Sequence, residues 1–175
     1  MRRLSAVAFV LILLAAPAAA DDWQTVAPAG LGFSVALPAK GEVKDEKVDL
    51  GGGKSAMVHT LQIRASNATY DVTIADYPKG TVESIGAEQV LDNARDGAMA
   101  NALGPLLSET KIDVAGHPAR ELTIDMSMDH VVRSRIFTLG DRLFNVGAIV
   151  KTSDAKAEHI ERYFASFKLT DGAQP

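Results

Sequence analysis

The chain has 175 residues, of which 47% are hydrophobic and 23% are charged, with a formal net charge of -4 and no cysteine. This length is typical of a single domain. The absence of cysteine excludes disulfides, cysteine-ligated zinc, iron–sulfur clusters and a thiol nucleophile. The mild acidity argues against a nucleic-acid binder, and an aromatic content of only 6% argues against a surface that stacks bases or sugars.

The N-terminal segment 1–20 has the pattern of a cleavable signal peptide. Two arginines precede an apolar run over residues 4–16, and small residues follow up to Ala20. The run is shorter than the roughly 20 apolar residues that span a bilayer. We therefore expect cleavage near Ala20 and a periplasmic or secreted single domain, residues 21–175, that does not span the membrane. Loss of the two arginines changes its formal net charge from -4 to -6.

The first half of the mature chain has the alternation of β-strands. Apolar residues at every second position predict a strand over 33–37. The charged stretch 40–53 ends in three glycines and is expected to be a loop or a loose hairpin. Two further alternating segments flank Ser66 and Asn67, which are typical turn residues. A two-residue turn there would impose two cross-strand pairs, Leu61 with Val72 and Ile63 with Tyr70.

Two segments have helical periodicity. Apolar residues recur every three and four positions near 82–103, which predicts one long helix that Thr81 or Ser84 could cap and that a glycine and a proline end. The same spacing predicts a C-terminal helix near 154–166, with Ser153 as its cap.

Strands are expected between these helices, and their apolar residues lie on both faces. Ile136 and Phe137 are adjacent, so in a strand they point to opposite sides. Gly140 and Asp141 predict a hairpin turn between the last two strands. A sheet that is apolar on both sides must be covered on both sides. We therefore predict an α+β fold, an antiparallel sheet with helices on both faces (an α-β-α sandwich).

The stretch from Gly51 to Ser55 resembles the end of a phosphate-binding P-loop. The full pattern requires a glycine where Val48 stands, and it requires a helix after the loop. Residues 56–64 instead alternate like a strand. We therefore interpret the glycines as a turn.

No pattern predicts catalytic residues, a metal or a cofactor. The sequence lacks the G-x-S-x-G motif, and its two S-x-x-K matches, Ser108–Lys111 and Ser153–Lys156, come without the S-D-N and K-T-G motifs that accompany S-x-x-K in the enzymes that use it. Its histidines lack the spacing of a helical zinc site, and the acidic turn before His130 has too few ligands for a calcium loop. These histidines are His59, His117, His130 and His159, of which His159 is expected on the exposed flank of the last helix. A triad of dispersed residues stays open, because such a triad is recognised by geometry.

Arg133 and Arg135 are the candidate site residues, because they share one face of a predicted strand. Arginine binds anions and carboxylates bidentately, so the pair could contact an anionic ligand or a partner. The alternative is cross-strand pairing, in which a three-residue turn would place Asp125 opposite Arg135 and Ser127 opposite Arg133.

Short blocks of turn and packing residues span most of the mature chain. They are Gly32–Pro38 after Trp23, Asp76–Pro78, Gly116–Leu122, Arg135–Phe144 and Phe164–Leu169. In this order they resemble the PsbP-like family, which includes an extrinsic subunit of photosystem II, a Ran-binding nuclear import factor and secreted bacterial proteins. The resemblance implies an α-β-α sandwich and a role in binding or assembly rather than catalysis.

Three functions follow as hypotheses. The first is an exported, non-catalytic binding or assembly module with a protein partner or small ligand whose identity the sequence does not specify. The second is a small-ligand or anion binder that uses Arg133 and Arg135. The third is a hydrolase with dispersed catalytic residues.

Overall fold

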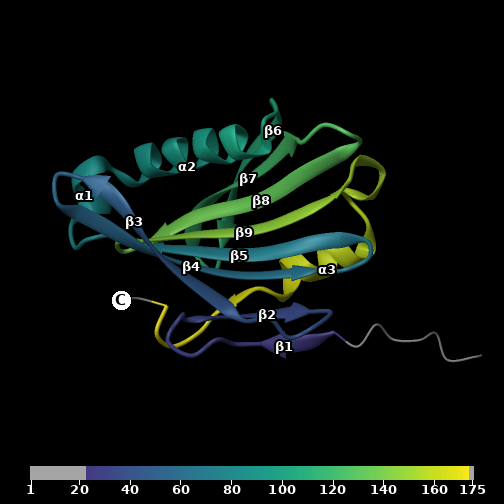
Figure 1. The fold of residues 1–175 in the computed structure, drawn as a ribbon, viewed down its shortest axis with the longest axis horizontal. Coiled ribbons are helices and arrows are strands. Elements are labelled where there is room, and N and C mark those ends of the chain that lie inside the picture. The colour runs from purple at the N-terminus through teal and green to yellow at the C-terminus, as the bar shows by residue number, and fades with distance from the viewer. Residues whose placement is uncertain (1–22, 174–175) are drawn as a thin grey trace, which may run out of the picture.

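The structure is a computed structural model that describes residues 23–173, so the expected signal peptide lies outside the described residues. Its main feature is a seven-stranded antiparallel sheet (Figure 1). In spatial order its strands are β3 (Val43–Gly51), β4 (Lys54–Arg64), β5 (Ala68–Asp76), β9 (Arg142–Lys151), β8 (His130–Leu139), β7 (His117–Asp125) and β6 (Leu106–Val114). A smaller sheet contains β1 (Gln24–Val26), β2 (Phe33–Leu37) and β10 (Lys168–Leu169).

The predicted hairpins are confirmed in their register. Leu61 lies opposite Val72 and Ile63 opposite Tyr70, as a two-residue turn requires. The turn at Gly140 also joins β8 to β9 as expected. These registers follow from the alternation, because a slip of one residue would move every apolar side chain to the wrong face.

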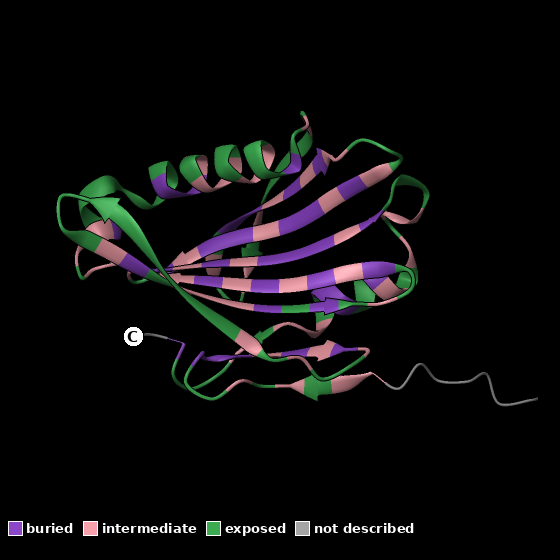
Figure 2. Cartoon of the chain, in the orientation of Figure 1, coloured by how far each residue is buried: buried purple, intermediate pink, exposed green. Residues whose placement is uncertain are grey.

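Of the two expectations for 40–53, the loop is wrong and the hairpin is closer, because most of this stretch is strand β3, which forms a hairpin with β4. β3 is an edge strand that pairs only with β4, and its side chains are almost all exposed (Figure 2). Its backbone is paired on one side while its charged side chains stay in water. Charge on an edge strand discourages pairing with other chains, so a charged sequence is compatible with a strand here.

The single helix expected near 82–103 is two helices, α1 (Thr81–Ile85) and α2 (Ala87–Ala102). They are separated by Gly86, whose φ of 93° lies outside the helical region. Neither expected hydroxyl caps α1. Instead the carboxylate of Asp141, in the β8–β9 turn, accepts hydrogen bonds from the backbone N–H groups of Gly80 (2.6 Å) and Val82 (2.8 Å). These bonds hold the pKa of Asp141 below its usual value.

The end of α2 shows why Gly104 is needed there. The left-handed residue at this end is Leu103, with a φ of 55°, and not the glycine. Gly104 instead allows a close approach of two backbones, because a Cβ at this position would lie 1.9 Å from the carbonyl oxygen of Asp125. The glycine therefore lets α2 turn directly onto the end of β7.

The C-terminal helix begins later than expected. A 3-10 turn, η1 (Thr152–Asp154), precedes α3 (Glu158–Ser166). The Ser153 hydroxyl donates to Asp154 and caps no helix, since α3 begins after Ala157.

The sheet buries apolar residues on both faces, as predicted. On one face Leu91 of α2 packs against Leu122, Ile124 and Ile136. On the opposite face the core is completed by α3, with Tyr163 among its residues, and by the small sheet (Figure 1). The α+β class with an antiparallel sheet is therefore confirmed. A purely helical layer on both faces is not, because the second layer combines one helix with three strands.

Within residues 23–173, none of the helices is long and apolar enough to cross a bilayer.

Candidate functional site

Arg133 and Arg135 project from β8 on the face of the sheet where α3 packs. Their guanidinium carbons lie 5.0 Å and 4.8 Å from the centre of the Phe164 ring on α3. Both also pair with Glu121 on β7, Arg133 through Nη2 at 2.9 Å and Arg135 through Nε at 2.6 Å. The structure therefore places the two predicted residues in one cluster, which we call the arginine cluster: Glu121, Arg133, Arg135 and Phe164.

Arg133 uses its donors inside the protein. Its side chain is only 7% exposed, and Nη1 donates to the carbonyl of Ala155 at 2.8 Å and to the carboxylate of Glu161. These bonds tie β8 to the segment before α3 and to α3 itself. An anion could reach this guanidinium only by displacing a protein partner.

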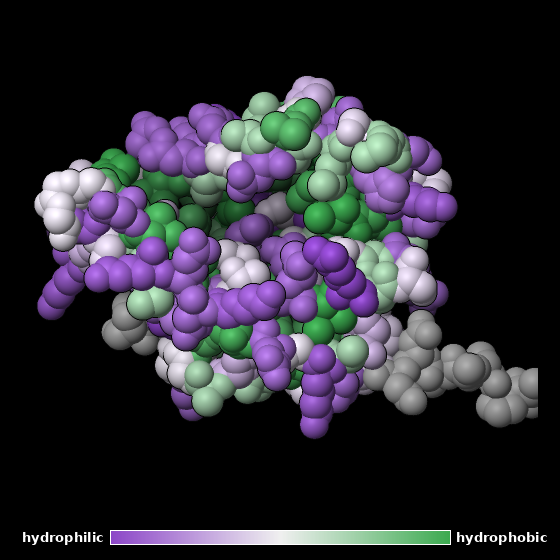
Figure 3. All heavy atoms as spheres, in the orientation of Figure 1, coloured by the Kyte–Doolittle hydropathy of each residue, from purple (hydrophilic) through white to green (hydrophobic). Residues whose placement is uncertain are grey.

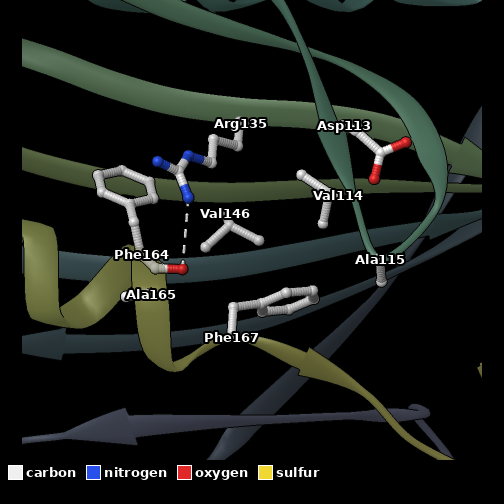
Figure 4. Close-up of a pocket in the computed structure, with 8 residues that line it drawn as sticks. All are labelled: Asp113, Val114, Ala115, Arg135, Val146, Phe164, Ala165 and Phe167. Carbon is white, nitrogen blue, oxygen red and sulfur yellow. Dashed lines mark hydrogen bonds between the residues drawn. The ribbon is translucent and has the colours of Figure 1, made fainter.

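Arg135 is more open, with a side chain that is 25% exposed. Its Nη1 makes a long hydrogen bond of 3.4 Å to the carbonyl of Phe164, and Nη2 makes no hydrogen bond to any of residues 23–173. The side chain borders a cavity of about 200 Å³ lined by six apolar residues, including Val146 and Phe167, and by Asp113 (Figure 4). The cavity thus combines a guanidinium and a carboxylate with apolar side chains.

Glu121 is the carboxylate that neutralises this cluster. Burial alone would raise the pKa of Glu121, but the hydrogen bonds and charges of Arg135 and Arg133 outweigh burial and hold the pKa below its usual value. Glu121 is therefore ionised at neutral pH. Because Arg133 holds the other carboxylate oxygen, Glu121 would keep a partner if Arg135 bound a ligand.

The expected cross-strand partners of the arginines are wrong, although the pairing with an acidic residue on β7 is of the expected kind. Arg135 lies opposite Glu121 and Arg133 opposite Thr123, whereas Asp125 faces Val131. The turn between β7 and β8 lies two residues earlier than assumed, and its three central residues, Ser127, Met128 and Asp129, have positive φ angles. Moving the turn by two residues shifts each cross-strand partner by four, so Arg135 pairs with residue 121 instead of residue 125.

Two further arginines of the sheet, Arg120 and Arg142, lie outside this cluster. Arg120 is on the opposite face, where Nη1 donates to Asp92 of α2 at 2.6 Å and Nη2 to Glu88 at 2.8 Å. Arg142 pairs with Asp76 and donates to three backbone carbonyls. Both side chains are almost fully buried, so both act as structural ties.

The histidines do not form a metal site with the acidic residues. His59 lies between two carboxylates, with Nδ1 2.7 Å from Asp45 and Nε2 3.4 Å from Asp76. His159 is half-buried, which corrects the expectation of an exposed flank, and its Nε2 is buried without a hydrogen bond. Across the described part of the chain, which includes the acidic turn before His130, no cluster of three or more potential ligands could hold a metal.

The glycine-rich stretch is a hairpin turn. Gly51 is the last residue of β3, Gly52 and Gly53 connect it to β4, and Lys54 and Ser55 are the first residues of β4. No helix follows, so the backbone amides that a P-loop directs at phosphate are not arranged in that way here.

Two residues that the structure makes important were missed by reasoning from the sequence. They are Glu121 of the arginine cluster and Asp71, a carboxylate of β5 whose pKa burial raises to about 6. Glu121 could have been found by placing the assumed turn two residues earlier, because that register puts residue 121 opposite Arg135. Asp71 lies at a polar position of an alternating strand, where its pattern is the same as that of a residue in water. Its position in the middle of the sheet depends on the strand order, which the local pattern does not contain.

Comparison with known proteins gives a fold and not a family. No family model matches the chain, and no curated protein matches it. The solution structure of cyanobacterial PsbP from Synechocystis is similar, with a TM-score of 0.53 and 13% identity over 88% of this chain and 96% of that chain. The crystal structure of a Pseudomonas aeruginosa protein of unknown function aligns with a TM-score of 0.39 and 13% identity over 82% of this chain and 92% of that chain. The first similarity indicates a PsbP-like fold.

Proposed function

We propose that this protein is an exported, non-catalytic binding or assembly module of the PsbP-like type. The PsbP-like fold supports a module of this type, although a fold does not by itself define a function. Export rests on the pattern of residues 1–20, and cleavage near Ala20 would release residues 21–175 as one domain. The α-β-α sandwich of the family would be present in a modified form, with strands sharing the second layer.

The observation that carries the binding function is the cavity beside Arg135. Nη2 of Arg135 has no hydrogen-bond partner among the described residues, Nη1 has only a bond of 3.4 Å, and apolar side chains line much of the cavity. A carboxylate accepts hydrogen bonds from a guanidinium edge, and a small apolar body would contact Val146 and Phe167. The geometry therefore supports an acidic group with a short apolar body, presented by a small ligand or by a partner's side chain.

The test compares benzoate with its neutral analogue benzamide in a calorimetric titration. We expect benzoate to bind at least tenfold more tightly, because only benzoate can form the ion pair. Arg135→Gln should remove this preference, and Glu121 keeps Arg133 as a partner in that variant. The control is Arg64→Gln, since Arg64 is exposed on β4. Equal binding of the two compounds, or a preference that survives in Arg135→Gln, would contradict the acidic-ligand assignment.

The assembly role and the absence of catalysis need separate experiments. Affinity capture from a periplasmic extract should recover a partner with the wild type and less of it with Arg135→Gln. Capture of nothing above background would count against assembly. Turnover of any compound in a broad panel of hydrolase substrates would overturn the non-catalytic assignment in favour of a dispersed active site.

A further inference from the structure

Asp71 lies in the middle of β5 on the side of the sheet where α2 packs. Its neighbours Tyr70 and Val72 point into the opposite core, so Asp71 points to the α2 side. The helix packs on β7 and β8. Strands β9, β5 and β4 continue the sheet beside α2 (Figure 1), and Figure 3 shows the molecular surface hollowed beneath that helix.

Gly147 makes the space that the Asp71 carboxylate occupies. The two residues pair across β5 and β9, and a Cβ at Gly147 would lie 2.6 Å from Oδ1 and 3.0 Å from Oδ2 of Asp71. Ser134 is the next residue in the same row, on β8, and its hydroxyl is hydrogen-bonded to Asn145. The surface around the carboxylate is therefore polar, and the carboxylate lies directly against the backbone of β9.

The Asp71 carboxylate has no ion pair and no hydrogen bond with any of residues 23–173. This differs from Glu121 and Asp76, each of which is held by arginine. Burial raises the pKa of Asp71 to about 6, because the charged form is poorly solvated and nothing in the described chain compensates for it. A half-buried carboxylate without a partner is an acceptor that a ligand could satisfy.

A second cavity, of about 370 Å³, lies on the same side of the sheet at the end toward which β5 runs. Its lining combines the apolar side chains of Leu50, Ile85 and Val90 with polar ones, Lys54 among them. We call the surface along β5 from Asp71 toward this cavity the β5 cleft; it has a carboxylate at one end and apolar side chains among those at the other.

We propose that the β5 cleft binds an organic ammonium compound, whose cationic group pairs with the Asp71 carboxylate and whose apolar part lies along β5 toward Leu50 and Ile85. A cation fits better than a neutral donor, because an ion pair in a poorly solvated position gains more electrostatic energy than a neutral hydrogen bond. This site lies on the opposite face of the sheet from the arginine cluster and does not depend on it.

The test is a titration of the purified protein with n-octylammonium, followed by calorimetry and by NMR shifts of backbone amides. We expect shifts around residues 71 and 147, and binding at least tenfold tighter than that of octan-1-ol, which has the same chain without the charge. Asp71→Asn should weaken ammonium binding at least tenfold. Binding at pH 5 should be about tenfold weaker than at pH 7.5, because the carboxyl group is then mostly protonated.

Two controls separate this site from the arginine cluster. Asp129→Asn, in the exposed turn before β8, and Arg135→Gln should both bind octylammonium like the wild type. Gly147→Ala is a second variant that should weaken binding, since its methyl group would displace the carboxylate. Equal binding of octan-1-ol, unchanged binding by Asp71→Asn, or amide shifts confined to other regions would overturn the proposal.

Discussion

Replacing Asp71 with asparagine should make the protein more stable at neutral pH. Asparagine has nearly the same shape but no charge to desolvate. The pKa of Asp71 rises from 3.8 to about 6 on folding, and each pKa unit corresponds to about 1.4 kcal/mol. Above pH 6 the wild type is therefore expected to be less stable than Asp71→Asn by about 2–3 kcal/mol.

The sign of the pH dependence follows from which state holds the proton. Between pH 4 and 6 the unfolded chain has largely lost the Asp71 proton, while the folded protein retains it. The unfolded state then binds fewer protons, so the contribution of Asp71 to the free energy of unfolding falls as pH rises through this window. At pH 4 the folded Asp71 is neutral and the unfolded chain still holds close to half of this proton, so the two variants should differ by only about 0.5 kcal/mol.

The assay is urea unfolding at pH 4, 5, 6 and 7.5, followed by fluorescence of the single tryptophan. Trp23 is a suitable probe because its ring lies edge-on against Tyr70, 5.4 Å between ring centres, next to Asp71 in the chain. The matched control is Asp129→Asn, at an exposed position whose φ of 60° asparagine also tolerates. Equal stability of wild type and Asp71→Asn at pH 7.5, or a difference that does not change with pH, would refute the reasoning.

Three further substitutions test the structural ties. Arg142→Met should lower the free energy of unfolding by about 3–5 kcal/mol, because it leaves the Asp76 carboxylate and three backbone carbonyls without their arginine donor. Urea unfolding measures this loss, and a loss below about 1 kcal/mol would contradict a structural role for Arg142. Gly104→Ala should be destabilising by more than about 2 kcal/mol, because its Cβ would overlap the Asp125 carbonyl, and near-wild-type thermal unfolding would disprove this close approach. Phe137→Ala should lower the free energy of unfolding by about 3–5 kcal/mol, since this fully buried ring stacks on Phe144 with 4.8 Å between ring centres. The same urea assay tests this, and a small loss of stability would indicate a loosely packed core.

The two sites proposed here lie on opposite faces of one sheet and have opposite charge. The arginine cluster offers a guanidinium edge, and the β5 cleft offers a carboxylate. Because Arg135→Gln and Asp71→Asn each change only one face, the two variants together show which face, if either, recognises a ligand. A loss of benzoate binding in Asp71→Asn would mean that the two sites are coupled.

Local sequence patterns were sufficient for those parts of the fold that depend on neighbouring residues. The alternation of Leu61 and Ile63 with polar residues determined both the strand and its register, because a half-buried strand has a side-chain period of two. The helical spacing identified both helical regions. It did not reveal the break at Gly86, because a glycine is tolerated inside a helical pattern and becomes a break only through its φ angle.

The candidate sites depended on the tertiary structure for a different physical reason. A single sequence shows that Arg133 and Arg135 share a face, but the identity of their partners depends on the position along the chain of a turn with three positive φ angles. Asp71 is the clearest example, since an aspartate at a polar strand position is normally solvated. Only the strand order places it at the centre of a sheet, against Gly147, where it loses much of its water without gaining a partner in the described chain. Desolvation depends on everything that surrounds a group in space, and therefore no local pattern could have predicted it.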